Sequence, residues 1–313
     1  MRILRHPAEI ALTDRGAVVA VGNFDGVHLG HRAVLDATRE IARREGAPLA
    51  LMTFEPHPFQ VFNPEVPPFR LTPFRAKAHR IEALGVDLLA VLHFDHALAQ
   101  VSAEDFVRRF LVEGLGARHV VVGYDFHFGH RRRGTPALLQ QQGQFHGFGV
   151  SVLQPIAAGD GAVYSSTRIR QHLTAGEPRE AARLLGHPFE IEGRVETGDR
   201  RGRTIGFPTA NLSLGDYLRP KGGVYAVRIA IEERAGRLEW HDGVANLGTR
   251  PTVGGGDLHL EAHLFDFAGD LYGRHIRVGL IQHLRPERKF AGLDALKAQI
   301  AEDARQARAI LRS

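Results

Sequence analysis

Cysteine is absent from these 313 residues. The chain therefore has no disulfide, no thiolate nucleophile and no metal bound through sulfur, and this composition predicts a reducing, cytoplasmic location. Long hydrophobic runs are missing as well, because no stretch approaches the roughly 18 apolar residues that cross a membrane. Charges interrupt the apolar positions of residues 1–16, so we expect neither a signal peptide nor a membrane span.

The rest of the composition is that of a globular protein, with 43% hydrophobic and 24% charged residues. The length exceeds that of one compact core and predicts two domains. A net charge of +5 and a pI near 9.9 favour anionic partners. Charge alone leaves nucleotides and nucleic acid both open.

Two sequence patterns meet near Gly186. Before it, short apolar runs alternate with helical periodicity, which predicts a parallel sheet covered by crossover helices. After it, short alternating stretches between glycine-rich turns predict an antiparallel sheet or small barrel, with a final helix over 293–311. We therefore expect domains at 1–186 and 187–313. The expected strands of the first part are 17–21, 48–54, 86–93, 118–123 and 149–156, and its expected helices include 29–45, 102–114 and 136–143.

A glycine-bearing loop, GNFDGVHLGHR (22–32), follows the first apolar run and opens a helix. A helix N-terminus has unpaired N–H groups and the positive end of a dipole, and Gly22, Gly26 and Gly30 let the backbone approach an anion. His28 and His31 are one helical turn apart, so both imidazoles face the same side and can donate hydrogen bonds to a phosphate. A metal site is the alternative, but it lacks a third ligand and an HExxH pattern; a structural role for the histidines is another.

Hydroxyl and guanidinium groups gather at YSSTRIR (164–170), where another helix is expected to begin. They can hold a triphosphate from a second side, with a planar fork from Arg170. The alternative is an ordinary Ser/Thr helix cap beside solvated arginines.

The second part has its own glycine-rich turn, GRTIGFPTANL (202–212). Its N–H groups can cradle phosphates, and the oxygens of Thr209 and Asn211 suit a hard cation such as Mg²⁺, which keeps several waters and needs few protein ligands. A turn whose Thr and Asn bond local backbone is the alternative. In LHLEAHLFDF, Glu261 shares one strand face with two histidines, opposite an apolar face, and the first face is either a site or solvent.

TFEPHP (53–58) and VVGYDFHFGHRRRG (121–134), like YSSTRIR, follow at the ends of later apolar runs. Further motifs of the second part are GVYAV (223–227), GVANLGTRPTVGG (243–255), LEAHLFDFAGDLYG (260–273) and LRPERKF (284–290). The first loop is similar to the signature of the HxGH nucleotidyltransferase superfamily. Taken together and in order, the motifs resemble the bacterial bifunctional riboflavin kinase/FAD synthetase family over essentially the whole chain.

The resemblance implies a fold and an activity. The fold is an α/β, Rossmann-like nucleotidyltransferase domain followed by an antiparallel Greek-key β-barrel with a C-terminal helix. The activity is ATP-dependent phosphorylation of riboflavin to FMN by the second domain, then adenylyl transfer from ATP to FMN by the first, giving FAD and pyrophosphate. The expected partners are ATP, riboflavin and FMN, with Mg²⁺ as cofactor.

The resemblance also assigns residues. It makes Glu261 the general base of the kinase and His28 and His31 the catalytic pair of the adenylyltransferase. The remaining assignments are ATP binding in the adenylyltransferase by Gly22, Asn23, Phe24, Asp25, Gly30, Ser165, Ser166, Thr167 and Arg170; flavin binding there by Asp125 and Phe126; ATP binding in the kinase by Gly202, Arg203, Gly206 and Thr209; flavin binding there by Arg285 and Phe290; and metal binding by Thr209 and Asn211.

Two other functions are compatible with parts of the pattern. A nucleotidyltransferase with another phosphorylated acceptor would not need the PTAN motif or Glu261. A nucleic-acid-binding barrel would carry aromatic residues interleaved with basic ones, whereas these motifs are glycine-rich phosphate loops, so no nucleic-acid partner is expected. Self-association cannot be deduced from the sequence.

Overall fold

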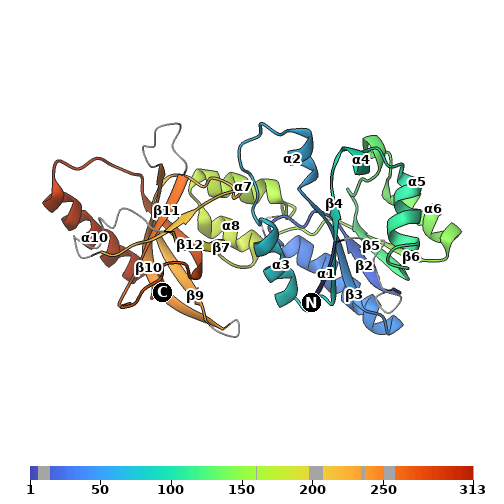
Figure 1. Cartoon of the computed structure of the whole chain (residues 1–313), viewed down its shortest axis with the longest axis horizontal. Helices are drawn as coiled ribbons and strands as arrows, with labels where there is room; N and C mark the ends of the chain where they lie inside the picture. The colour runs from blue at the N-terminus through green and yellow to red at the C-terminus, as the bar shows by residue number, and fades with distance from the viewer. Residues whose placement is uncertain (6–14, 160, 197–206, 234–236, 250–257, 313) are drawn as a thin grey trace. The chain divides into compact units, whose positions relative to one another are not determined.

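The computed structural model describes residues 1–5, 15–159, 161–196, 207–233, 237–249 and 258–312 (Figure 1). The chain packs into two units. The first comprises Met1–Val66 and Thr72–Ser165, and the second comprises Pro67–Leu71 and Ser166–Ser313.

The first unit is built on a six-stranded sheet with the order β1-β4-β3-β2-β5-β6. Every neighbouring pair is parallel, which confirms the sheet predicted from the alternating pattern. The strands are β1 (Arg2–Leu4), β2 (Val18–Val21), β3 (Leu49–Glu55), β4 (Leu88–His93), β5 (His119–Gly123) and β6 (Gly149–Leu153). Strand β1 is additional to the predicted set.

Strand β2 shows why the apolar runs are continuous rather than alternating. Its four residues are all buried, because helices cover both faces of a parallel sheet. Val19 packs into the hydrophobic cluster on one face, and Val18 packs into the cluster on the other.

Helices and helical turns fill the connections of the first unit. They are α1 (Leu29–Glu45), α2 (Pro58–Phe62), α3 (Phe74–Ala83), α4 (His96–Ala99), α5 (Ala103–Phe106), a π-helical turn (Val107–Val112), a 3₁₀ turn (His130–Arg132) and α6 (Pro136–His146). The helix predicted over 29–45 has those bounds, and it ends at Gly46, whose φ of 59° is left-handed. The segment predicted as one helix over 102–114 is α5 continued by the π-helical turn.

The second unit contains a six-stranded antiparallel sheet with the order β7-β12-β9-β10-β11-β8. A bridge between Glu196 and Asn211 joins its two edges, so the sheet forms a nearly closed barrel. The predicted barrel is confirmed. Its strands are β7 (Phe189–Arg194), β8 (Ala210–Ser213), β9 (Gly223–Glu232), β10 (Leu238–Thr249), β11 (Leu258–Leu264) and β12 (His275–Arg285).

The described residues of the second unit also form the helices α7 (Ser166–Ala175), α8 (Pro178–Leu185) and α10 (Leu293–Leu311). The predicted final helix is α10, and its apolar face, with Ala307 and Leu311, packs with Val224 of β9 and Val244 of β10. Helices α7 and α8 also group with this unit by packing. The functional boundary at 186/187 stays a prediction, because packing and activity are different criteria for a domain.

Candidate functional site

The loop after β2 has a tightly constrained backbone. Phe24, Gly26 and Val27 have φ values of 49°, 90° and 44°. The left-handed region costs a non-glycine residue on the order of 1 kcal/mol or more. Phe24 and Val27 adopt it with only 2% of each residue exposed. Burial of these two side chains therefore offsets the strain and fixes the shape of the loop.

Thr72, which the sequence analysis missed, holds this loop from across the unit. Gly26 N–H donates to Thr72 Oγ1 at 2.8 Å, and Thr72 N–H donates to Asp25 Oδ1 at 2.9 Å. The Thr72 hydroxyl also donates to Asp25 Oδ1 at 3.3 Å. Asp25 is buried and thus shapes the loop; its predicted contact with ATP stays a prediction.

His28 and His31 meet at the start of α1, as their spacing predicts. His28 is the N-cap residue, and its Nδ1 accepts a hydrogen bond from the His31 N–H at 3.2 Å. An accepting Nδ1 carries no proton, so the neutral His28 ring holds its proton on Nε2 and donates from that atom. The two rings are stacked, with centroids 3.6 Å apart and planes 15° from parallel.

Burial and two nearby groups favour the neutral form of His31 by lowering its pKa. Desolvation by burial, followed by the nearby His28 and Lys77, holds the pKa of His31 well below its ordinary value. Within the described residues, His31 Nδ1 is buried and has no hydrogen-bond partner. A buried polar atom without a partner is costly. A ligand that supplies a hydrogen-bonding oxygen or N–H at this point would remove that cost.

Gly30 lies in a tight place beside this pair. A Cβ at position 30 would lie 3.1 Å from His28 Cε1 and 3.1 Å from Tyr164 Cβ. A side chain there would therefore need the His28 ring and Tyr164 to shift by a few tenths of an ångström. The structure therefore gives Gly30 a packing role besides its predicted place in the ATP site.

Gly22 and Asn23, which are also predicted to bind ATP, belong to the same loop as the His28–His31 pair. Gly22 N–H donates to Met52 O of β3 at 3.1 Å, and Asn23 O accepts from the Thr53 hydroxyl at 3.1 Å. The carboxyl ends of β2, β3 and β5 share one edge of the sheet, where ligands of parallel α/β folds collect.

The segment after β5 carries the predicted flavin residues of the first unit. Asp125 is exposed, and Phe126 is half-buried, with its ring 5.4 Å from the buried Phe128 ring. Sequence and structure agree that both follow β5, beside the loop after β2. Their contact with flavin stays a prediction.

The YSSTRIR segment divides between the units. Ser165 ends the first unit, whereas Ser166, Thr167 and Arg170 lie in α7 of the second. Arg170 Nε donates to Phe69 O at 2.9 Å, and its guanidinium carbon lies 5.4 Å from the Phe69 ring centroid. The assignment of these residues to the ATP site stays a prediction.

The second unit has a cavity of about 340 Å³ at the start of β8. Thr209 and Asn211 line it, together with the connection from Leu264 to Tyr272. Glu261 of β11 pairs in register with Asn211, so the two residues occupy neighbouring positions on adjacent strands. The structure thus brings together the predicted metal residues and the predicted base; Gly202, Arg203 and Gly206 lie outside the described residues.

The predicted alternation along β11 is confirmed. Leu260, Ala262 and Leu264 are buried, and Glu261 is half-buried on the opposite face. The oxygen atoms available to a cation here are the Thr209 hydroxyl, the Asn211 amide oxygen and, on the adjacent strand, the Glu261 carboxylate. Hard divalent cations prefer such oxygen ligands. Among the described residues, no group of three His, Asp or Glu side chains is arranged to hold a metal.

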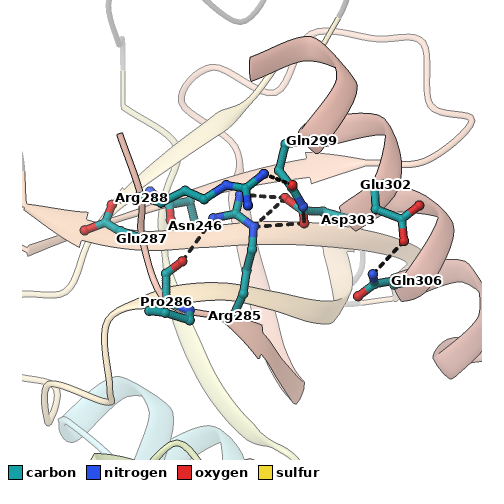
Figure 2. Close-up of polar contacts among 9 residues, drawn as sticks. All are labelled: Asn246, Arg285, Pro286, Glu287, Arg288, Gln299, Glu302, Asp303 and Gln306. Atoms are coloured by element: carbon teal, nitrogen blue, oxygen red, sulfur yellow. Dashed lines mark hydrogen bonds and ion pairs between the residues drawn. The ribbon is translucent and has the colours of Figure 1, made fainter. Parts of the chain in front are cut away.

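Figure 2 shows a polar cluster at the end of β12 that ties the LRPERKF segment to α10. Arg285 donates to buried Asp303 from Nε at 3.0 Å and from Nη2 at 2.7 Å, and Gln299 donates to the same carboxylate at 2.7 Å. Arg288 donates to Gln299, and Asn246 of β10 donates to Glu287 at 2.9 Å. The LRPERKF segment is therefore held by α10 on one side and by β10 on the other.

The cluster includes Arg285, one of the two predicted flavin residues of the kinase, and the ring of the other, Phe290, lies near it. The guanidinium of Arg285 is engaged by Asp303 and lies 5.7 Å from the Phe290 ring centroid. Their flavin contact stays a prediction, whereas the structural role of Arg285 is an addition that sequence spacing did not reveal. Asn246 was also missed; it pairs in register with Glu261.

Comparisons with known proteins agree with both halves of this description. The FAD synthetase family model matches residues 10–168, and the riboflavin kinase family model matches residues 185–311. A bifunctional riboflavin kinase/FMN adenylyltransferase of Escherichia coli strain K12 is 46% identical over 294 residues, covering 94% of this chain and 92% of the relative. One of Pseudomonas fluorescens is 45% identical over 311 residues, covering 99% and 98%.

A solved structure gives the same result for the fold. A crystal structure described as a macrolide-efflux protein from Streptococcus pneumoniae matches with a TM-score of 0.85 and 30% identity, covering 98% of each chain. In the parts of this chain that the structure describes, no helix is both long and apolar enough to cross a membrane. On the two family models and the near full-length identity, the chain belongs to the family of bifunctional riboflavin kinase/FMN adenylyltransferases.

Proposed function

We propose that the two activities of this family are divided between the domains predicted at 1–186 and 187–313, each with its own ATP and flavin site. The second domain phosphorylates riboflavin to FMN, and the first transfers an adenylyl group from ATP to FMN. The observation that carries this division is the presence of a helix N-terminus with stacked imidazoles in the first unit and, in the second, of a cavity lined by Thr209 and Asn211, the latter paired in register with Glu261.

Adenylyl transfer needs charge stabilisation rather than a base. The attacking oxygen of the FMN phosphate is already ionised near neutral pH. His28 and His31 would therefore act as neutral hydrogen-bond donors to the α-phosphate while pyrophosphate leaves. The low pKa of His31 supports this role, because a neutral imidazole donates without adding a titrating charge.

For the domain predicted at 1–186 we also propose residues that bind ATP and FMN. The backbone of the loop after β2 would hold ATP phosphates at the N-terminus of α1. The proposed ATP residues are Gly22, Asn23, Phe24, Asp25, Gly30, Ser165, Ser166, Thr167 and Arg170, and the proposed flavin residues are Asp125 and Phe126.

Phosphorylation of riboflavin needs a base, because a ribityl hydroxyl is a poor nucleophile at neutral pH. Glu261 would accept the hydroxyl proton as the γ-phosphoryl group transfers. Its register position beside Asn211 supports this role, since the base must lie close to the phosphate and its metal. Arg285 and Phe290 are the proposed flavin residues of this unit.

Magnesium is the proposed cofactor, held by Thr209 and Asn211 together with phosphate oxygens. When bound, it would neutralise the triphosphate charge. Both residues line the cavity, and Asn211 is only 5% exposed, so its amide is held in a fixed place. The proposed Gly202, Arg203, Gly206 and Thr209 would bind the ATP phosphates.

The test incubates the purified chain with riboflavin, ATP and Mg²⁺ and separates FMN from FAD by chromatography. We expect both products. His28→Ala should stop at FMN, and Glu261→Ala should make FAD only when FMN is supplied. If either single change abolished both reactions in a folded protein, the division between units would be wrong.

A further inference from the structure

Lys77 is a buried cation in the first unit that none of the proposed chemistry uses. It lies on α3, and its side chain is fully buried, with 0% exposed. Its Nζ is 3.1 Å from Glu55 Oε1 and 3.4 Å from Thr53 Oγ1, both on β3. Burying an ion pair costs desolvation that an apolar pair would avoid. A buried ammonium that is retained despite this cost is therefore a candidate for a functional role.

The sequence singles out the same residue. Lysine occurs only at positions 77, 221, 289 and 297, whereas lysine and arginine together number 40. The chain thus uses arginine for nearly all its cations, and position 77 is its one lysine before residue 221. A lysine ammonium is compact where a guanidinium is broad and planar. The buried position between α3 and β3 accepts the smaller group.

Hydrogen bonds connect Lys77 to the loop after β2. The Thr53 hydroxyl donates its single proton to Asn23 O at 3.1 Å, so Lys77 must be the donor in its own contact with Thr53. The path runs from the ammonium through Thr53 to the backbone of the loop. The same chain segment holds the loop again through Thr72, five residues earlier, which bonds Gly26 and Asp25.

The charge of Lys77 also acts on the His28–His31 pair. The groups that act on His31 are His28, from the same turn of α1, and Lys77, from α3, and both lower the pKa of His31. The imidazole pair therefore lies within the field of the buried ammonium. A phosphate at the N-terminus of α1 would be attracted by this positive charge as well as by the helix dipole.

We propose that Lys77 is a positioning residue for adenylyl transfer, which fixes the loop after β2 through Thr53 and places a buried positive charge behind the His28–His31 pair. This inference rests on the adenylyltransferase activity proposed for the first unit. Glu55 is the counter-ion that keeps the ammonium in place.

The test compares four variants of the full chain: Lys77→Met, Glu55→Gln, the two changes combined, and Arg75→Met as a control. Arg75 lies on the same helix but is exposed, so it removes the same charge from the surface. Each variant is assayed for FAD formation from FMN and for riboflavin phosphorylation, which reports independently that the second unit is intact. The His31 imidazole is titrated by NMR in each folded variant.

We expect Lys77→Met to lower kcat for adenylyl transfer by about tenfold to a hundredfold, the range for losing a charged hydrogen bond. Riboflavin phosphorylation should not change. The His31 pKa should rise, because one of its depressing charges is gone, and Arg75→Met should leave adenylyl transfer and His31 as they are. The combined variant has no unpaired buried charge, so it should fold even where Lys77→Met does not, yet it should still have the low kcat and the raised His31 pKa.

Wild-type kcat in the combined variant would overturn the inference, as would an unchanged His31 titration. Either result would leave the proposed function intact provided that the wild-type chain makes FAD. If the wild-type chain made no FAD from FMN and ATP, the proposed function itself would fail.

Discussion

The carboxylate of Asp303 should decide whether the kinase unit keeps its LRPERKF segment in place. Only 3% of the residue is exposed, and it accepts hydrogen bonds from Arg285 and Gln299. Asp303→Ala removes one partner of this pair and leaves the Arg285 guanidinium, 18% exposed, without its counter-charge. Figure 2 shows this contact between the segment and α10, next to the one between Arg288 and Gln299.

The expected magnitude follows from burial. Removing one partner of a buried ion pair costs roughly 3–5 kcal/mol. The partial exposure of Arg285 places this case at about 3 kcal/mol, since water can reach the stranded cation. For a unit of this size such a loss lowers the melting temperature by about 10 °C. Displacement of residues 285–290 should also lower riboflavin phosphorylation, on the order of a hundredfold.

The assay is thermal unfolding followed by tryptophan fluorescence. Trp240 is the only tryptophan in the sequence and lies on β10, so its signal reports the second unit alone. At temperatures where its second unit is still folded, Asp303→Ala should have the wild-type rate of adenylyl transfer, measured with FMN supplied. A wild-type melting temperature in Asp303→Ala would refute the reasoning.

A double variant separates stability from flavin binding. Arg285→Met with Asp303→Leu replaces the ion pair by an apolar pair, which is often neutral for stability. We expect the melting temperature to recover. If phosphorylation stays low in this stable variant, Arg285 has a role in flavin binding besides its structural one; recovery of phosphorylation would remove that role.

Three further results are expected. Glu261→Gln should lower kcat of riboflavin phosphorylation about a hundredfold or more, because the amide cannot accept the hydroxyl proton; activity within threefold of wild type would exclude Glu261 as the base. His28→Ala should slow adenylyl transfer about a hundredfold, equivalent to about 3 kcal/mol for one lost donor, and an unchanged rate would show that the Nε2 donor does not reach the reacting phosphate. For His31, the folded-state pKa lies below the unfolded value, so the unfolded chain binds the extra proton and stability falls as the pH drops below about 6.5. Urea unfolding at pH 7 and 5.5 should show a loss of about 1 kcal/mol that His31→Asn largely removes, whereas an equal loss in His31→Asn would mean that other groups cause it.

Local patterns in the sequence predicted the local structure of both candidate sites. The helix from Leu29 to Glu45 was predictable from its apolar spacing and from Gly46, and the two faces of β11 follow from strict alternation. These features depend on neighbours within one turn or one strand, so a single sequence contains their cause. The motif resemblance likewise identified the family, which the comparisons confirm.

Local reasoning could not find the residues that hold the sites together. Thr72 bonds Asp25 across 47 positions, Asn246 bonds Glu287 across 41, and neither pair has a local pattern. The π-helical turn after α5 was missed as well, because apolar periodicity does not distinguish i→i+5 from i→i+4 hydrogen bonding.

By itself, the sequence determined the class of each unit, the position of the imidazole pair at a helix N-terminus, and the placement of Glu261 on a polar strand face. Tertiary structure alone decided that the pKa of His31 is lowered, that Asp303 engages Arg285, and that Lys77 is connected through Thr53 to the loop after β2. The physical reason is that pKa values and buried ion pairs depend on which distant segments exclude water from a group, and chain folding sets that exclusion.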